Sequence, residues 1–231
     1  MLDITPTEWT AILLSLRVAA VATLVATPLG VALAWLLARR QFWGKSLLDA
    51  AIHLPLVLPP VVTGYLLLLA FGRKGPLGAL LADYLGIVFA FRWTGAALAC
   101  GVMSFPLLVR PIRLSIEAVD RKLEQAAETL GAAPWRVFAT VTLPLALPGV
   151  LAGMVLGFAK AIGEFGATIT FVSNIPGETQ TLPSALYTYT QVPGGDLGAL
   201  RLSVVAVAIS LVALMSAEWL SRRIGRHVGG G

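Results

Sequence analysis

The sequence predicts an all-α integral membrane protein with five transmembrane helices, and three observations support this fold class. Of the 231 residues, 57% are hydrophobic and only 13% are charged, about half of the roughly 25% that is typical of soluble domains. The mean hydropathy is +0.83. The apolar residues also form runs that can cross about 30 Å of hydrocarbon, which takes about 20 helical residues. We interpret residues 1–231 as a single transmembrane domain.

Five apolar runs qualify as membrane spans. We expect them to be helices, because unpaired backbone amides cost too much in lipid for irregular structure. The second and third runs are short, and we expect them to borrow flanking residues. The five runs are approximately Trp9–Ala38, Leu54–Phe71, Trp93–Val109, Val137–Ile162 and Leu202–Leu220.

The first two runs carry distinctive features. The first follows Asp3 and Glu8 rather than a basic segment, and it is longer than the h-region of a signal peptide, so we do not expect a cleavable signal. The second opens with Leu54-Pro-Leu-Val-Leu-Pro-Pro60, whose three prolines should break or kink the helix. Broken helices at membrane depth often border transport pathways, although prolines also mark the ends of spans.

The fourth run contains three glycines and two charges. Gly149, Gly153 and Gly157 are four residues apart, which lets another helix approach closely. We favour packing within the same chain over packing at a subunit interface. Lys160 and Glu164 are charges near the outer end of this run, where a functional role is the default hypothesis. At a span end we favour a snorkelling or paired structural role.

The segment between the last two runs, residues 163–199, is only moderately apolar and is rich in Gly, Thr and Pro. It is too broken for a simple span. We expect an extracytoplasmic loop, either an ordinary surface loop or a partly re-entrant one. Non-helical backbone at membrane depth is tolerated only against protein or a water-filled cavity.

A polar, helix-forming loop joins the third and fourth runs over about residues 114–136. Asp120 can cap a helix, Gly131 suits the left-handed position past its end, and Pro134 suits the first turn of the next helix. Periodicity alone would favour a plain amphipathic connector lying on the membrane. The small apolar residues would also let a partner surface approach closely. The residues expected on one helical face are Leu123, Ala126, Ala127 and Leu130.

The distribution of lysine and arginine predicts the orientation in the membrane. If this loop is cytoplasmic, the N-terminus lies outside and the C-terminus lies in the cytoplasm. Eleven basic residues then lie on the cytoplasmic side and four lie outside. This asymmetry agrees with the positive-inside rule and supports the orientation.

Several classes of function are disfavoured. The net charge of +5 comes from basic residues at the ends of apolar runs, so nucleic-acid binding is not expected. The single Cys100 excludes an intrachain disulfide, and His53 and His227 match no metal-ligand spacing, so we expect neither a metal nor another cofactor. Gly44-Lys45-Ser46 is not a phosphate-binding loop, because Arg39 occupies the position of the required glycine. We find no catalytic constellation and do not expect an enzyme.

The loop sequence Glu124-Gln-Ala-Ala-Glu-Thr-Leu-Gly131, followed by Val141-Thr-Leu-Pro144, resembles the EAA loop of ABC-transporter permeases. The consensus of that family is Glu-Ala-Ala, three residues, Gly, nine residues, then Ile-x-Leu-Pro. Gln125 takes the usual Glu position, with Glu124 one residue earlier, and Val141 stands in for Ile. The resemblance implies a cytoplasmic docking point for a separate ATPase subunit. The implied ATPase-coupling residues are Glu124, Gln125, Ala126, Ala127 and Gly131.

Other segments resemble the molybdate permease subunit of bacterial ABC importers, over about Trp9 to Leu220. They are Leu54-Pro-Leu-Val-Leu-Pro-Pro60, Ser104-Phe-Pro106 and the block from Gly163 to Thr179. The resemblance implies a permease in the bacterial inner membrane that moves molybdate or tungstate into the cytoplasm. It also implies a homodimer, an ATP-binding cassette ATPase and a periplasmic molybdate-binding protein. A permease for another oxyanion such as sulfate is an alternative, as is a non-transporting membrane scaffold or enzyme.

Within that family, the substrate would pass along the interface between two copies of the chain. A transit pathway should bind weakly, because otherwise the ion would not leave. It still needs hydrogen-bond donors, since a dianion loses hydration as it crosses. We therefore expect hydroxyls and amides rather than a cage of arginines. The candidates are Thr63, Ser104, Thr168, Thr170, Ser173 and Asn174.

Overall fold

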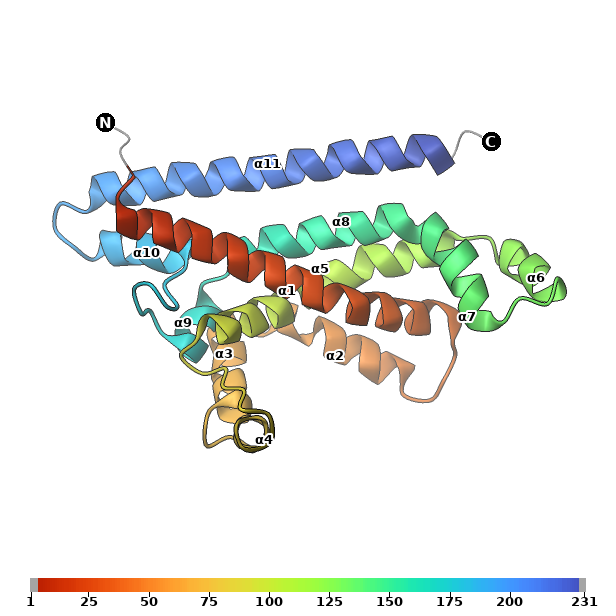
Figure 1. Cartoon of the computed structure of the whole chain (residues 1–231), viewed down its shortest axis with the longest axis horizontal. Coiled ribbons are helices and arrows are strands. Elements are labelled where there is room, and N and C mark those ends of the chain that lie inside the picture. Colours follow the sequence, from red (N-terminus) through yellow and green to blue (C-terminus); the bar gives the residue numbers. More distant parts are fainter. Residues whose placement is uncertain (1–3, 229–231) are drawn as a thin grey trace.

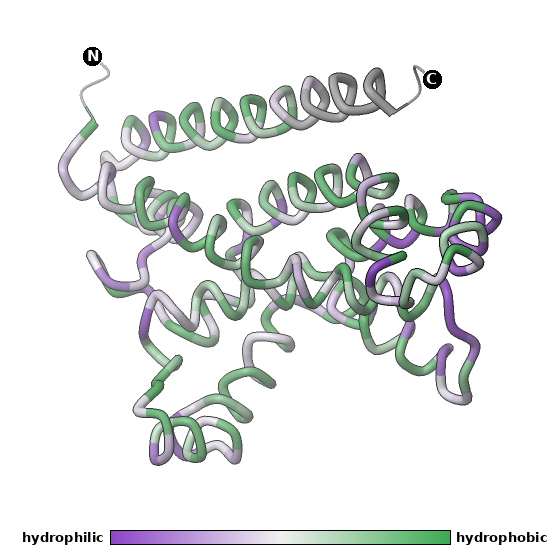
Figure 2. Tube along the Cα trace, turned by 45° about the vertical axis from the view of Figure 1, so that its right-hand side comes forward, coloured by the Kyte–Doolittle hydropathy of each residue, from purple (hydrophilic) through white to green (hydrophobic). Residues whose placement is uncertain are grey.

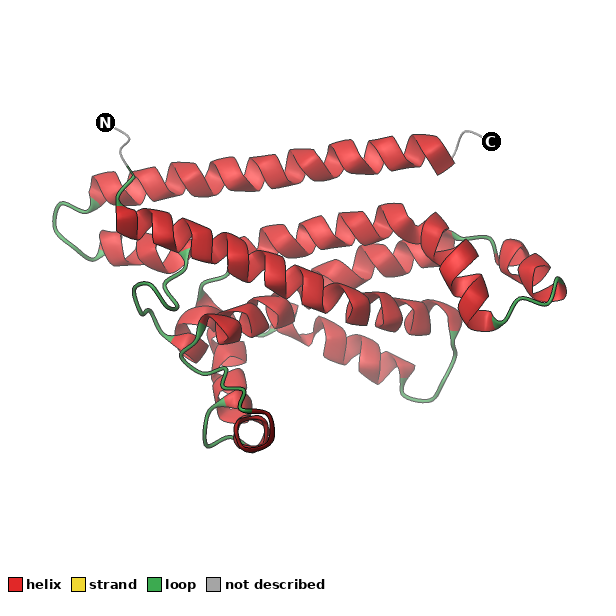
Figure 3. Cartoon of the chain, viewed as in Figure 1, coloured by secondary structure: helices red, strands yellow, loops and turns green. Residues whose placement is uncertain are grey.

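The computed structural model describes residues 4–228, and every regular element in that range is a helix (Figure 1, Figure 3). This confirms the predicted all-α fold class. The long helices are α1 (Pro6–Arg39), α5 (Trp93–Ala118), α8 (Leu143–Ile162) and α11 (Asp196–Val228). The shorter elements are α2 (Lys45–Val57), α3 (Pro60–Phe71), α4 (Pro76–Leu85), α6 (Arg121–Thr129), α7 (Pro134–Val137), a π-helical turn η1 (Phe138–Thr142), α9 (Gly166–Val172) and α10 (Leu182–Thr190).

Within the described residues, four helical stretches are long and apolar enough to cross a membrane, and the bent pair α2–α3 makes a fifth candidate. Two of the predicted spans are longer than expected. The third was predicted to end at Val109 but α5 continues to Ala118, so the polar loop begins only at Val119. The last apolar run lies inside α11, which begins at Asp196.

The second predicted span, Leu54–Phe71, is not a single helix. α2 ends at Val57, α3 begins at Pro60, and the two axes differ by 116°. The prolines explain this break, as the sequence predicted, because Pro60 has no amide hydrogen to continue the helix and restricts the residue before it. α2 also begins earlier than expected, at Lys45.

The core of the bundle forms around α5, which packs against both α1 and α8. The glycines of α8 make this close packing possible. A methyl group at Gly149 would meet Ser115 of α5, and one at Gly153 would meet the backbone oxygen of Leu108. One at Gly157 would contact the Leu108 side chain. The predicted role of these glycines in packing within the chain is confirmed.

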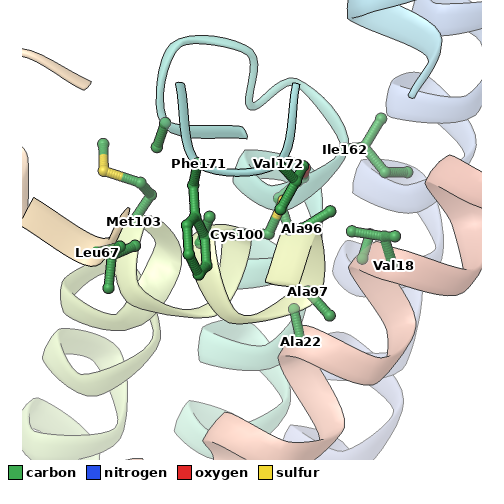
Figure 4. Packing of buried hydrophobic residues seen from close by; sticks show 14 of the residues in the cluster. Val18, Ala22, Leu67, Ala96, Ala97, Cys100, Met103, Ile162, Phe171 and Val172 are labelled. Carbon is green, nitrogen blue, oxygen red and sulfur yellow. The ribbon is translucent and has the colours of Figure 1, made fainter. Parts of the chain in front are cut away.

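Of the two alternatives for residues 163–199, the ordinary surface loop is wrong, because this segment contains the helices α9 and α10. α9 packs against α3 and α5, and Ala167, Phe171 and Val172 are fully buried. Figure 4 shows Phe171 and Val172 in the cluster that includes Cys100 of α5. The backbone re-enters the protein as a short helix, which satisfies its own amides, so the re-entrant alternative describes it better than a surface loop.

The outside of the bundle is apolar along the lengths of the long helices, and polar residues gather in connections and at helix ends (Figure 2). Leu211 and Val212 of α11 are 54% and 64% exposed. Such a surface suits contact with lipid. α11 is held at its start, where Arg201 forms an ion pair of 2.8 Å with the buried Glu8 of α1.

Candidate functional site

The predicted docking loop contains a short helix, α6, with well-defined ends. The Asp120 side chain accepts a hydrogen bond of 2.9 Å from the Lys122 amide and caps the helix. Gly131 has φ +86, in the left-handed region that favours glycine. Pro134 then lies in the first turn of α7. These three features confirm the local predictions made for Asp120, Gly131 and Pro134.

Most of the apolar face of α6 is exposed. Every side chain of α6 is at least partly exposed. Leu123 is 50% exposed and Leu130, which follows the helix, is 89% exposed. Ala126 is exposed and Ala127 is half-buried. Figure 1 shows α6 projecting from one end of the bundle, so this face is available to another protein.

Glu124 has different surroundings from the rest of α6, because its side chain points inward. The Arg39 guanidinium donates to Glu124 Oε1 from Nε at 3.2 Å and from Nη2 at 3.0 Å. The hydroxyl of Thr142 donates to the same oxygen at 2.6 Å. Arg39 Nη2 also donates to the Val119 carbonyl at 3.0 Å. We call Arg39, Glu124, Thr142 and the Val119 carbonyl the Arg39 cluster.

The coupling residues predicted from the sequence therefore separate into two groups. Gln125, Ala126 and Gly131 are exposed. Glu124 instead attaches α6 to the last turn of α1 and to η1. The sequence alone does not indicate that Arg39 and Thr142 are partners of Glu124. A carboxylate with little exposure needs a partner, and the Glu124 side chain is only 15% exposed. Nothing in the sequence spacing indicates that a residue 85 positions away provides that partner.

Three of the predicted pathway residues come from the neighbouring helices α3 and α9. Thr63 is buried in α3, and its hydroxyl oxygen has no hydrogen-bond partner among the described residues. Thr168 and Thr170 of α9 donate to backbone carbonyls of their own segment, at 2.9 Å and 2.8 Å. A methyl group at Gly64 of α3 would meet Ala167 and Thr170, so the two helices are in close contact.

The other three pathway candidates lie elsewhere. Ser104 is buried in α5 and donates to the Gly101 carbonyl at 3.3 Å. Ser173 is exposed just after α9, with φ +65, an unfavourable backbone angle for a residue other than glycine. Asn174 donates to the Thr188 hydroxyl at 2.8 Å. The structure thus brings Thr63, Thr168 and Thr170 to adjoining helices, with Ser173 and Asn174 at the end of α9.

The two intramembrane charges of the fourth run form a pair, as predicted. Lys160 Nζ lies 2.7 Å from Glu164 Oε2. The other carboxylate oxygen of Glu164 accepts a hydrogen bond of 2.9 Å from the Ala167 amide. The Glu164 side chain is only 1% exposed. Glu164 therefore links the end of α8 to the first turn of α9.

A groove of about 580 Å³ lies between α1, α2 and α5. Its lining is almost entirely aliphatic and aromatic, with Val21, Ile52 and Phe105 contributed by the three helices. A molybdate or sulfate ion would lose its hydration there without gaining hydrogen-bond donors. The groove is therefore unsuitable as an oxyanion site.

Comparison with known proteins gives consistent results. Residues 26–226 match the family described as binding-protein-dependent transport system inner membrane component. The chain is 61% identical over 219 residues to the molybdenum transport system permease protein ModB of Escherichia coli (strain K12), covering 95% of this chain and 96% of that protein. It is 58% identical over 224 residues to the corresponding protein of Haemophilus influenzae, covering 97% and 98%.

A solved structure also has a similar fold. It is a crystal structure of a bacterial alginate ABC transporter in complex with an alginate pentasaccharide-bound periplasmic protein, which matches with a TM-score of 0.74. The match covers 95% of this chain and 80% of that chain. The sequence identity is 17%, so this comparison bears on the fold alone.

Proposed function

Because this chain belongs to the binding-protein-dependent transport system inner membrane component family, we propose that it is the permease subunit of an ABC importer that moves molybdate into the cytoplasm. ATP hydrolysis takes place on a separate ATPase subunit. The observation that carries this proposal is α6, a capped helix with an exposed apolar face that projects from the bundle and contains the EAA-type sequence. This face is the surface on which the ATPase docks.

Molybdate is favoured as substrate because relatives named as molybdenum permeases match nearly the whole chain at about 60% identity. Tungstate is a dianion of the same shape and shares the route. Sulfate is the less supported alternative. Thr63, Thr168 and Thr170 provide uncharged hydroxyls on the adjoining helices α3 and α9. The Thr63 hydroxyl has no partner among the described residues, whereas Thr168 and Thr170 would donate to the ion only after releasing their bonds to backbone carbonyls. Such groups replace part of the hydration shell without trapping the ion.

The assembly contains two copies of this chain, with the pathway between them. Two ATPase subunits bind on the cytoplasmic side, and a periplasmic molybdate-binding protein delivers the ion on the other side. Closure of the ATPase dimer on ATP draws the two α6 helices together and opens the pathway outward. Hydrolysis returns the pathway to its inward-open form.

The N-terminus lies outside the cytoplasm and the C-terminus lies inside. Two observations support this orientation. α6 and the end of α11 lie at one end of the bundle, while the start of α1 lies at the other (Figure 1). The end with α6 also has most of the lysines and arginines, in agreement with the positive-inside rule.

Deletion of the gene tests the substrate assignment. We expect the strain to lose high-affinity molybdate uptake and to show low molybdoenzyme activity at trace molybdate. Molybdate at about millimolar concentration should restore that activity through less selective routes. A strain that loses sulfate uptake and keeps trace molybdate uptake would show that the substrate assignment is wrong, while the permease assignment would stand.

A further inference from the structure

We propose that Arg39 is a positioning residue for energy coupling, which locks α6 to the ends of α1 and α5 and to the turn before α8 through the Arg39 cluster. Movement of α6 is then transmitted to three helices of the bundle together. This inference rests on the proposed function. It assigns to the end of α1 the role of connecting the docking helix to the rest of the bundle.

The Arg39 cluster forms a joint, by which we mean a set of hydrogen bonds that connects four segments of the chain. Arg39 lies in the last turn of α1, and Val119 is the residue that ends α5. Glu124 lies in the first turn of α6, and Thr142 ends η1. One carboxylate oxygen of Glu124 accepts from both Arg39 and Thr142, while Arg39 Nη2 is shared between Glu124 and the Val119 carbonyl. A shift of any one segment therefore disturbs the bonds to the others.

The burial of the cluster distinguishes it from other ion pairs near this end of the bundle. The side chains of Arg39 and Glu124 are only 9% and 15% exposed. Arg113 pairs with Asp49 and Glu117, but these three side chains are 27%, 38% and 39% exposed. Burial strengthens a hydrogen-bonded ion pair but also costs desolvation. A pair with this little exposure therefore adds little to the free energy of unfolding, but it fixes the relative positions of the segments that it joins.

The geometry at position 39 favours arginine over lysine, because a single side chain reaches two acceptors in different directions. The planar guanidinium donates to Glu124 through Nε and Nη2 and to the Val119 carbonyl through Nη2. A lysine offers one nitrogen on a flexible chain and cannot reproduce this fork. Lysine at this position should therefore keep the positive charge but lose some of the hydrogen bonds to Glu124 and to the Val119 carbonyl.

The cluster also connects α6 to the candidate pathway residues. Thr142 directly precedes α8, whose glycines pack on α5. At the other end of α8, Lys160 holds Glu164, and Glu164 binds the Ala167 amide of α9. Thr168 and Thr170 belong to α9. The chain of contacts from α6 to α9 is therefore continuous, and it begins at the Arg39 cluster.

The test uses the whole importer in proteoliposomes, with this chain, its ATPase and the binding protein. The measured quantity is the number of ATP molecules hydrolysed for each molybdate taken up. We expect Arg39→Met and Glu124→Gln each to raise this ratio about tenfold, while the ATPase still co-purifies. The double variant should be no worse than either single variant, because both changes break the same joint.

Two further variants complete the experiment. Arg40→Met is the matched control, since it removes the neighbouring guanidinium, which is exposed and lies over the Trp35 ring at 5.8 Å. Its ratio should equal that of the unaltered importer. Arg39→Lys should give a ratio between those of the unaltered importer and Arg39→Met.

Three results would overturn the proposal. They are an unchanged ratio in Arg39→Met and Glu124→Gln, additive effects in the double variant, and an equal effect of Arg40→Met. If a buried charge left alone prevents folding of a single variant, Thr142→Val serves instead, because it removes one hydrogen bond and keeps the ion pair. We expect it to raise the ratio about threefold, and an unchanged ratio would overturn the proposal. An unaltered chain that binds no ATPase would instead contradict the proposed function.

Discussion

At the scale of single residues, Gly131 adopts the left-handed conformation that follows the end of the docking helix α6. Its φ of +86 is accessible to glycine without strain, and a methyl group added there would have open space around it. Within this chain, the effect of a substitution at this position is therefore conformational rather than steric.

We expect Gly131→Val to weaken ATPase binding and to abolish molybdate uptake. A β-branched residue in the left-handed region costs about 1–3 kcal/mol, so the chain would leave α6 in another direction. Gly131→Asn is the matched control, because asparagine tolerates this region. Co-purification of the ATPase and uptake at equal expression are the measurements. Normal uptake by the valine variant would argue against a role for this turn in docking.

At the scale of helices, the contact of α8 with α5 depends on the absence of side chains at Gly149 and Gly153. Gly153 faces the Leu108 carbonyl of α5, a backbone atom that cannot move aside as a flexible side chain can. Gly163, at the end of α8, is exposed and has its nearest neighbours at 3.9 Å from an added methyl group.

Gly153→Ala should therefore destabilise the protein, by about 1–3 kcal/mol as is typical of overpacking. Gly163→Ala should be nearly neutral and provides the matched control. Thermal unfolding of the purified proteins in detergent compares the two. Equal midpoints for both variants would contradict the packing of α8 on α5.

At the scale of the whole molecule, the orientation in the membrane is open to a direct test. With Cys100 replaced by alanine, a cysteine at Glu128 should be protected from an impermeant maleimide in intact cells and labelled after permeabilisation. A cysteine at the exposed Gln191, between α10 and α11, should be labelled in intact cells. Labelling of position 128 from outside intact cells would reverse the orientation.

The sequence correctly predicts features that depend on residues close together in the chain. The α2–α3 break follows from adjacent prolines, and the ends of α6 follow from Asp120 and Gly131. The burial of α9 was missed, because its Gly and Thr content resembles a loop until α3 packs against it. The Arg39–Glu124 pair was missed since the two residues meet only when α1 and α6 are placed together by the fold. The periodicity of the sequence predicts which residues share one face of a helix, but it does not predict which helices pack against that face.

Uptake by the reconstituted importer tests the central claim most directly. Proteoliposomes that contain this chain and its ATPase, with binding protein on the side opposite α6, should accumulate radiolabelled molybdate only when ATP is supplied to the ATPase. Excess tungstate should compete, and excess sulfate should leave uptake unchanged. Uptake without ATP, or accumulation of sulfate in place of molybdate, would contradict the account.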